Sequence, residues 1–330
     1  MEFIADIGAF LLKAIILVVA LMLVISAVAG AAQKQKGSSK GELKLIDLSE
    51  QMKAQADQMR LQMLQKKQRK AAAKAVKQAR KREQQHDQRL FVMDFNGSID
   101  AKEVDQLRRE VNAILQVATD KDIALIRLES GGGTVNGYGL GAAQLQRLKD
   151  HGMQVAVAVD KVAASGGYMM ASVAHKIYAA PFALIGSVGV VAQIPNFHRF
   201  LKKHDVDYEQ LTAGEYKRTL TLFGENTDEG RRKFKQDLEA IHGQFKAHIQ
   251  QHRPELDIDR IATGEVWTGQ QAIEQGLVDD IMTSDDVLMR QANDYHLYQV
   301  KYISKKALSQ RLSGAVSAMV HAFIGSLKQP

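Results

Sequence analysis

The fold is decided by one stretch of the sequence, DIALIRLESGGGTVNGYGLGAAQLQRLKDHGMQVAVAV (residues 122–159). Its two ends, 122–129 and 153–159, are short apolar runs typical of buried strands. Between them a glycine-rich turn leads into 136–150, which has the length and composition of a helix. A strand, a helix and a second strand in this order predict a βαβ unit with parallel strands.

The same alternation continues on both sides of this unit. Further strands are expected at 89–95 and 206–213, and further helices at 101–118, 165–174, 196–204 and 228–252. Residues 175–180 and 183–194 are apolar but too short to cross a membrane. Strands that alternate with helices indicate an α/β fold. A chain of 330 residues with 45% hydrophobic residues has enough apolar surface for a large core.

A separate apolar stretch lies near the N-terminus. Residues 14–32 form 19 uncharged residues between Lys13 and Lys34, and a helix of about 20 residues spans a bilayer. We therefore expect a transmembrane anchor over 1–33. A cleaved signal peptide and a buried helix are the alternatives, although a signal peptide begins with positive charge and this chain begins with Glu2 and Asp6.

The net charge of +7 is concentrated in one segment. Residues 33–90 hold 16 Lys or Arg and 6 Asp or Glu, a net charge of +10, which leaves −3 for the rest of the chain. We interpret 34–88 as a juxtamembrane linker, either a solvated helix beside anionic lipid or a flexible tether. No aromatic residue interleaves these charges, so a specific nucleic-acid partner is not expected.

The side of the membrane on which the body lies is left open by the sequence. Four lysines follow the span and one precedes it: Lys34, Lys36, Lys40 and Lys44, against Lys13. The positive-inside rule favours a cytoplasmic body, but long domains are translocated largely regardless of charge.

Glycine-rich turns follow the predicted strands, where open α/β sheets place their sites. The first is Ser130-Gly131-Gly132-Gly133-Thr134. Its N–H groups can face a ligand. It lacks the Gly-Lys-Ser/Thr of a phosphate loop and the third glycine of a dinucleotide fingerprint.

Two further turns carry candidate catalytic side chains. Ser165 lies in Ala164-Ser165-Gly166-Gly167-Tyr168, and a serine between a strand and a helix is exposed for nucleophilic attack, or else caps the helix. Lys217 lies in the turn 212–218. A lysine is usually solvated, but burial lowers the pKa of a lysine so that it can act as a general base.

Four motifs together resemble those of the signal peptide peptidase A family. They are VAASGGYMMAS (162–172), IGSVGV (185–190), TAGEYKR (212–218) and TGEVWTGQQAIEQGLVD (263–279). The resemblance covers roughly 90–300 and the N-terminal anchor. It implies a crotonase/Clp-protease-like fold over a protease domain at 89–300, followed by a helical tail at 301–330. It also implies peptide hydrolysis at the inner membrane by a homo-oligomeric ring that uses neither a cofactor nor a metal.

The resemblance also implies a role for each matching residue. Ser165 is the nucleophile of a Ser–Lys dyad, Lys217 is its general base, and Ser187 hydrogen-bonds the lysine. The oxyanion hole is implied at the amides of Gly166 and of Gly132 or Gly133. Gly131 stands where the family has a proline, so this loop is expected to be less preorganised.

Other chemistries are weaker alternatives. The candidates for the histidine and aspartate of a Ser-His-Asp triad are His175, His198, His204, Asp205 and Asp207. The sequence has no His-Glu-x-x-His motif, and its lack of cysteine excludes thiolate chemistry.

A membrane-anchored serine endopeptidase that acts on signal-type or membrane-derived polypeptides is thus the leading hypothesis. An inactive membrane scaffold with a protease-like fold is the alternative. A third hypothesis is an acyl-CoA enzyme with the same kind of fold, in which Lys217 would have no role. Whether Ser165 and Lys217 pair within one chain or across protomers stays open.

Overall fold

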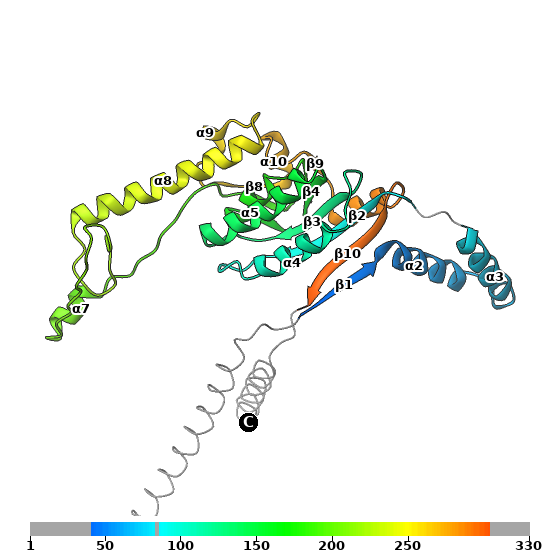
Figure 1. Cartoon of the computed structure of the whole chain (residues 1–330), viewed down its shortest axis with the longest axis horizontal. Coiled ribbons are helices and arrows are strands. Elements are labelled where there is room, and N and C mark those ends of the chain that lie inside the picture. Colours follow the sequence, from blue (N-terminus) through cyan, green and yellow to red (C-terminus); the bar gives the residue numbers. More distant parts are fainter. Residues whose placement is uncertain (1–40, 83–85, 304–330) are drawn as a thin grey trace, which may run out of the picture. The chain divides into compact units, whose positions relative to one another are not determined.

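The computed structural model describes residues 41–82 and 86–303 (Figure 1). They belong to two compact units, of which Lys44–Lys301 is the larger. In the smaller unit, the amide of Gly41 donates to the hydroxyl of Tyr302 at 2.8 Å. The predicted anchor at 14–32 and nearly all of the predicted tail lie outside the described residues. No helix within the described residues has both the length and the apolar character to cross a membrane.

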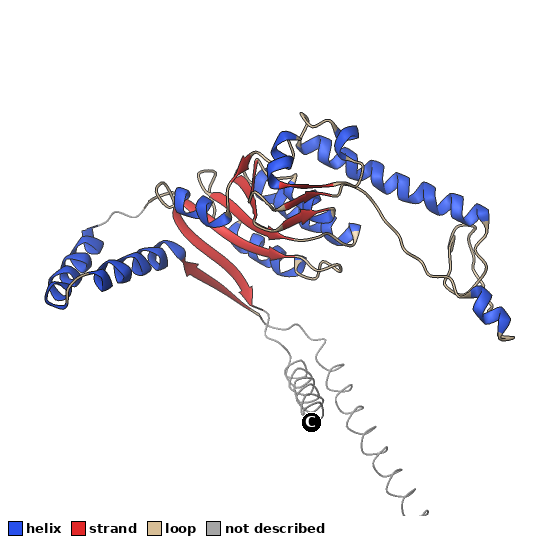
Figure 2. Cartoon of the chain, turned by 180° about the vertical axis from the view of Figure 1, so that it is seen from behind, coloured by secondary structure: helices blue, strands red, loops and turns tan. Residues whose placement is uncertain are grey.

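Strands and helices alternate along most of the described chain (Figure 2). The strands are β1 (Glu42–Asp47), β2 (Arg89–Asn96), β3 (Ile123–Glu129), β4 (Gln154–Val159), β5 (Val162–Ala164), β6 (Lys176–Ala179), β7 (Leu184–Gly186), β8 (Val266–Thr268), β9 (Asp280–Ile281) and β10 (His296–Ile303). The helices are α2 (Leu48–Met63), α3 (Lys66–Arg82), α4 (Val104–Ile114), α5 (Val135–Asp150), α6 (Gly166–Ala171), α7 (His198–Lys203), α8 (Asp228–His252), α9 (Ile258–Ile261), α10 (Gly269–Glu274) and α11 (Ser284–Gln291).

The strands form two sheets. The larger sheet has seven strands in the order β1-β10-β2-β3-β4-β6-β9, and its pairs from β10 to β9 are all parallel. The smaller sheet has the order β5-β7-β8, with β5 and β7 parallel and β8 antiparallel to β7. The prediction of an α/β fold rich in parallel strands is confirmed.

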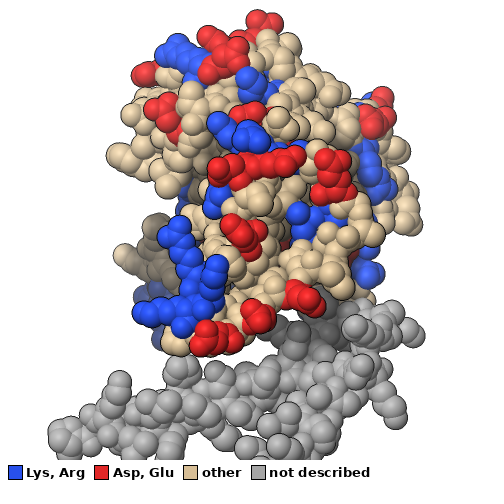
Figure 3. All heavy atoms as spheres, turned by 90° about the vertical axis from the view of Figure 1, so that its left-hand side faces the viewer, with Lys and Arg blue, Asp and Glu red and all other residues tan. Residues whose placement is uncertain are grey.

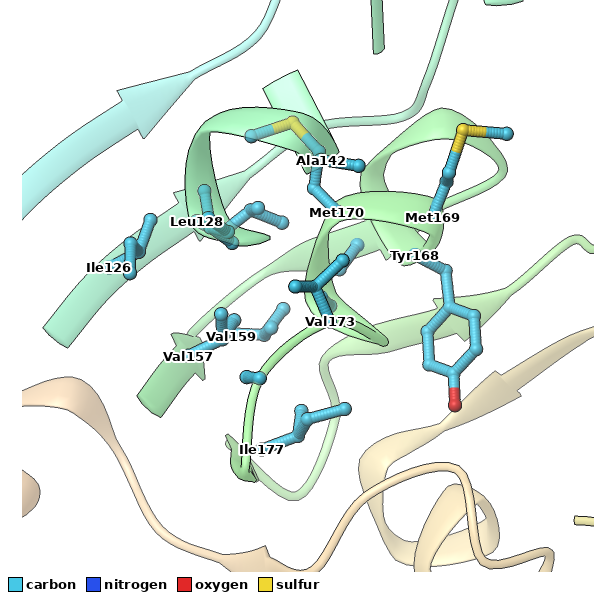
Figure 4. Close-up of a cluster of buried hydrophobic side chains, with 14 of the residues drawn as sticks. Ile126, Leu128, Ala142, Val157, Val159, Tyr168, Met169, Met170, Val173 and Ile177 are labelled. Atoms are coloured by element: carbon cyan, nitrogen blue, oxygen red, sulfur yellow. The ribbon is translucent and has the colours of Figure 1, made fainter. Parts of the chain in front are cut away.

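The core lies between the large sheet and the helices that cover it. In α4 the buried residues Val104, Leu107, Val111 and Ile114 recur at helical spacing, so one stripe of the helix faces the sheet. Figure 4 shows side chains of α6, β3 and β4 within one buried hydrophobic cluster. Tyr168 of α6 is fully buried, and its hydroxyl donates to the carbonyl of Leu277 at 2.9 Å. This packing fixes the start of α6, where Ser165 lies.

Most predicted elements are present, although some bounds differ and one predicted strand is absent from the described structure. The helix expected at 228–252 is α8, whereas the helix expected at 165–174 is shorter because α6 ends at Ala171. The strand expected at 206–213 is wrong, since these residues are exposed coil without strand pairing. An apolar pattern alone does not form a strand when no neighbouring strand is available to pair with it.

The predicted linker 34–88 contains regular structure where it is described. It includes β1, which joins the large sheet, and two helices, α2 and α3. The first turn of α3 carries no acidic residue. The strand β10 was not expected from the sequence and adds a second strand to this edge of the sheet.

Residues 189–227, here called the arm, connect the small sheet to α8. They contain α7 but little other regular structure, and most are exposed. Figure 1 shows the loops of the arm next to the N-terminal end of α8 and α7 at the far end of the arm. The amide of Phe197 donates to the carbonyl of Leu222 at 2.7 Å, and the ring of Phe223 packs against Phe197 and Tyr208. The arm is therefore held together mainly by its own contacts.

The exposed charges are mixed in sign. Figure 3 shows Lys and Arg side chains interspersed with Asp and Glu on one face of the molecule. Several of the charges pair along α8, as in Arg231 with Asp228 and Lys233 with Asp237. Such exposed pairs contribute little to stability.

Candidate active site

Two serines follow the paired strands of the small sheet. Ser165 comes directly after β5 and Ser187 directly after β7, and the preceding residues, Ala164 and Gly186, are partners in the parallel register. The amide of Ser165 donates to the carbonyl of Gly186 at 2.7 Å. Ser165 and Ser187 therefore both lie at the carboxyl ends of these two neighbouring strands.

Both serines have backbone angles that L-residues rarely adopt. The φ angle is +52° at Ser165, with ψ −119°, and +49° at Ser187. A strained residue of this kind costs on the order of 1–3 kcal/mol and is typical of active sites. Ser165 stands at the N-cap position of α6, but its side chain makes no capping hydrogen bond. The hydroxyl is thus not used as a helix cap.

The first glycine-rich turn lies directly against Ser165. A Cβ atom at Gly132, where φ is +90°, would lie 2.7 Å from Cβ of Ser165 and 2.8 Å from the amide nitrogen of Gly166. A Cβ atom at Gly133 would lie 2.1 Å from the carbonyl oxygen of Ile99. Only glycine allows this close approach of backbone to backbone. The structure thus brings the glycines predicted for the oxyanion hole next to the predicted nucleophile.

The amides in this region differ in their hydrogen bonds. The amide of Gly132 donates to Oγ of Ser130 at 3.1 Å. Among the described residues, the amides of Gly133 and Gly166 have no acceptor. An unbonded amide can donate to the oxyanion of a tetrahedral intermediate. Gly133 and Gly166 therefore keep free amides among the predicted oxyanion glycines, whereas the amide of Gly132 is already bonded within the loop.

A buried network behind this turn was missed by the sequence analysis. Oγ of Ser130 and the hydroxyl of Tyr138 are within hydrogen-bond distance, and the Tyr138 hydroxyl also donates to the carbonyl of Ser98 at 2.9 Å. A Cβ atom at Gly166 would lie 2.4 Å from Cγ of Tyr138. Burial raises the pKa of Tyr138. The phenol is therefore neutral and acts as a fixed support for both glycine-rich turns.

Ser165 opens onto a cavity of about 790 Å³. Gly132, Gly133, Gly166 and Ser187 line the same cavity. Helix α8 contributes a further wall through Ile241, His242 and Phe245. The sequence analysis gave α8 no part in the site, because an amphipathic helix carries no signal for which of its side chains border a cavity.

Lys217 does not lie in this cavity. It belongs to the arm, is exposed, and lines a second cavity of about 830 Å³ formed by residues between Ile194 and Phe223. Its amide donates to the carbonyl of Gly214 in a turn. Within one chain the structure therefore unites the predicted nucleophile, Ser187 and the oxyanion glycines, but not the predicted base.

The histidines considered for a catalytic triad are elsewhere. His198 is the first residue of α7 in the arm and His204 is the C-cap of that helix, and Nδ1 of His175 accepts from the amide of Val155 at 3.0 Å. None of the three lines the Ser165 cavity, whereas His242 does. Within residues 41–82 and 86–303, no group of three His, Asp or Glu side chains is placed to hold a metal ion.

A strained serine beside glycine amides and an apolar cavity, on an α/β fold, is an arrangement suited to acyl transfer. Comparison with known families agrees with this class. The description "Peptidase family S49 N-terminal" matches residues 2–145, and "Peptidase family S49" matches residues 147–297. The chain belongs to peptidase family S49.

Its relatives include proteins called SohB. "Probable protease SohB" of Haemophilus influenzae is 49% identical over 319 residues, which is 92% of this chain and 90% of the relative. "Probable protease SohB" of Buchnera aphidicola subsp. Acyrthosiphon pisum is 52% identical over 229 residues, 69% of this chain and 68% of the relative. "Protease 4" of Salmonella typhi is 29% identical over 206 residues, 59% of this chain and 33% of the relative. This chain is thus a SohB-like protease of family S49.

Proposed function

We propose that this protease is a serine endopeptidase in which Ser165 is the nucleophile and Lys217 is the general base. The observation that carries the proposal is the geometry around Ser165: a strained turn at the edge of the small sheet, with Gly132 packed against it and the unbonded amides of Gly133 and Gly166 beside it. The crotonase/Clp-protease-like assignment of the fold belongs to the same proposal and is supported by the parallel sheet.

The reaction proceeds by acyl transfer. Neutral Lys217 accepts the proton of the Ser165 hydroxyl while Oγ attacks the peptide carbonyl carbon. The resulting oxyanion is held by the amides of Gly166 and Gly133. Protonated Lys217 then gives its proton to the leaving amine, and an acyl-enzyme forms. Water, deprotonated by the same lysine, hydrolyses the ester and restores Ser165.

Lys217 reaches Ser165 from a neighbouring protomer in this proposal. Support comes from the separate cavities of the two residues and from the exposed apolar side chains of the arm, which include Val191, Phe200 and Leu211. An exposed apolar segment of this kind is typical of a protein interface. Repeating the contact around an axis gives a closed homo-oligomeric ring.

The substrates are polypeptides of the signal or membrane-derived type, and the protein is held in the inner membrane by residues 14–32. The cavity next to Ser165 has apolar side chains from Met169, Val190 and Phe245, which suits apolar segments of a substrate. The basic helix α3 is placed beside anionic lipid. Whether the protease domain lies on the cytoplasmic or the outer side is left to experiment.

The separation of Ser165 from Lys217 within one chain also favours a second candidate, an inactive membrane scaffold. A fluorophosphonate probe distinguishes the two. We expect the purified full-length protein to be labelled at Ser165, as shown by mass spectrometry, and Ser165→Ala to abolish both labelling and peptide hydrolysis. A protein that is folded and assembled, yet neither labelled nor active, would favour the scaffold.

A further inference from the structure

A chain of hydrogen bonds runs from the first glycine-rich turn to the loop after β2. The amide of Gly132 donates to Oγ of Ser130 at 3.1 Å. Oγ of Ser130 also pairs with the hydroxyl of Tyr138, which donates to the carbonyl of Ser98 at 2.9 Å. Ser130 is 2% exposed and Tyr138 is 0% exposed. The two hydroxyls are therefore shielded from solvent and depend on these protein partners for their hydrogen bonds.

The direction of each bond follows from the groups involved. A carbonyl oxygen only accepts, so the single proton of the Tyr138 hydroxyl is used on Ser98. The Ser130 hydroxyl therefore donates to Tyr138 and keeps a lone pair for the amide of Gly132. The carbonyl of Gly97, at 3.3 Å, is a longer alternative acceptor for the Ser130 proton. These groups thus form one directed chain, in which each hydroxyl both donates and accepts.

The other end of the same turn is anchored to the same loop. The amide of Thr134 donates to the carbonyl of Ile99 at 2.9 Å. The hydrogen-bond chain ends at Ser98, the neighbour of Ile99 in this loop. Gly133 therefore lies between two residues with bonded amides, Gly132 and Thr134, while its own amide has no acceptor among the described residues. The position of the Gly133 amide is thus set by its bonded neighbours.

Tyr138 also reaches the second glycine-rich turn. A Cβ atom at Gly166 would lie 2.7 Å from Cδ2 of Tyr138, so the aromatic ring packs directly on the backbone of this turn. One side chain is therefore linked by hydrogen bonds to the turn that holds Gly133 and is in contact with the turn that holds Gly166. The separation of these two free amides depends on Tyr138.

We propose that Tyr138 and Ser130 are positioning residues of the proteolytic reaction, which hold the two glycine-rich turns at the separation that the oxyanion requires. This inference rests on the proposed function, because it treats the amides of Gly133 and Gly166 as the oxyanion donors. Neither Tyr138 nor Ser130 lines the cavity next to Ser165, so both act through the backbone of the turns. Donors that are fixed in place before the reaction stabilise the transition state more than the bound substrate. Loss of either hydroxyl should therefore lower kcat rather than raise KM.

The test removes one hydroxyl at a time from the full-length protein. Tyr138→Phe keeps the ring that packs on Gly166 and loses only the oxygen, whereas Ser130→Ala removes the acceptor of the Gly132 amide. Each substitution should lower kcat for peptide hydrolysis by about tenfold, less than the loss of a complete oxyanion donor. KM should change by less than about twofold. Because both hydroxyls act through one chain, the double variant should be no worse than Ser130→Ala alone.

A transition-state analogue separates positioning from a general loss of stability. A peptide boronic acid forms a tetrahedral adduct with Ser165 that places an oxygen where the oxyanion lies. Tyr138→Phe should bind this compound about tenfold more weakly than the wild-type protein does. An uncleaved peptide should bind to Ser165→Ala equally well with and without Tyr138→Phe, because ground-state binding does not use the oxyanion donors to the same extent.

A matched control completes the experiment. Tyr178→Phe makes the same change at a buried tyrosine of β6, in a different core cluster, and should leave kcat, KM and the affinity for the boronic acid unchanged. Wild-type kcat and boronic acid affinity in Tyr138→Phe, a higher KM at unchanged kcat, or additive effects of Tyr138→Phe and Ser130→Ala would overturn the positioning role. A wild-type protein that neither cleaves peptides nor forms the adduct at Ser165 would instead overturn the proposed function, and this inference with it.

Discussion

Ser165 and Ser187 occupy equivalent positions after two paired parallel strands, and both have positive φ angles. The amide of Ser165 donates to Gly186, and the amide of Ser187 donates to Glu265 at 2.6 Å. The small sheet therefore holds the two hydroxyls at the same edge of the same cavity. In the proposed mechanism Ser165 attacks the substrate, and Ser187 orients the amine of the lysine.

Replacing Ser187 tests this division of roles. Ser187→Ala should lower kcat by about 10- to 100-fold, because the lysine loses a partner while the nucleophile and the oxyanion donors remain. The rate of fluorophosphonate labelling should fall with kcat, whereas the thermal midpoint should change little. Loss of activity as complete as in Ser165→Ala would show that Ser187 does more than orient the base.

The two members of the dyad should act as one unit. Ser165→Ala and Lys217→Ala should each lower kcat by about 10⁴-fold or more, and the double variant should be no worse than either single variant. Lys217→Arg should be equally inactive, because a guanidinium with a pKa above about 12 is not a neutral base. Single-turnover kinetics would measure these effects. Substantial activity in Lys217→Ala would reject this base and make His242 the next to test.

Mixing inactive variants tests whether the dyad is shared between protomers. An assembly of Ser165→Ala and Lys217→Ala chains contains some interfaces with both an intact serine and an intact lysine. Co-expression of the two should therefore restore part of the wild-type activity, up to about a quarter in a random assembly. A mixture of Ser165→Ala with the double variant Ser165→Ala/Lys217→Ala, in which no chain has a hydroxyl at position 165, serves as the control. Co-assembled chains that stay inactive would place both residues in one chain.

Alanine substitutions at the adjacent residues Gly131 and Gly132 test the geometry of the proposed oxyanion loop. Gly132→Ala should reduce kcat by about 10²-fold or more, because its Cβ would collide with Ser165 and with the amide of Gly166. Gly131→Ala should be nearly neutral, since no atom outside its chain neighbours lies within 4 Å of the position that a Cβ atom would take there. The same open space at Gly131 is compatible with the proline expected from the family resemblance. Equal effects of the two substitutions on peptide hydrolysis would contradict this geometry.

The proposed anchor predicts a simple fractionation result. Full-length protein should stay with membranes through high-salt and carbonate washes, because about 20 apolar residues provide strong insertion. Deletion of residues 1–35 should release the protein. Externally added protease acting on intact spheroplasts then reports the side of the catalytic domain. Full-length protein in the carbonate supernatant would argue against an anchor at 14–32.

The sequence by itself determined the α/β class and several elements with their bounds. The reason is local: short apolar runs, glycine-rich turns and the periodicity of α8 are properties of neighbouring residues. The motifs around Ser165 and Gly132 were also readable, since each combines a strand end with glycine, whereas Ser187 was assigned only from the family resemblance. The strand expected at 206–213 was wrong because strand formation also requires a pairing partner, which short-range patterns do not encode.

Only the tertiary structure decided which of these motifs meet. The register of β5 with β7 places Ser165 beside Ser187, and the bridge between Ser130 and Ala163 brings the glycine loop to Ser165. Tyr138 lies in the helix that follows the first glycine-rich turn and also supports the second turn, and α8, which is distant in sequence, adds a wall of the cavity. These side chains acquire a role only by packing. Lys217 was predicted from its motif, but the structure places it outside the Ser165 cavity of the same chain. The position of a residue depends on long-range contacts, which its motif does not encode.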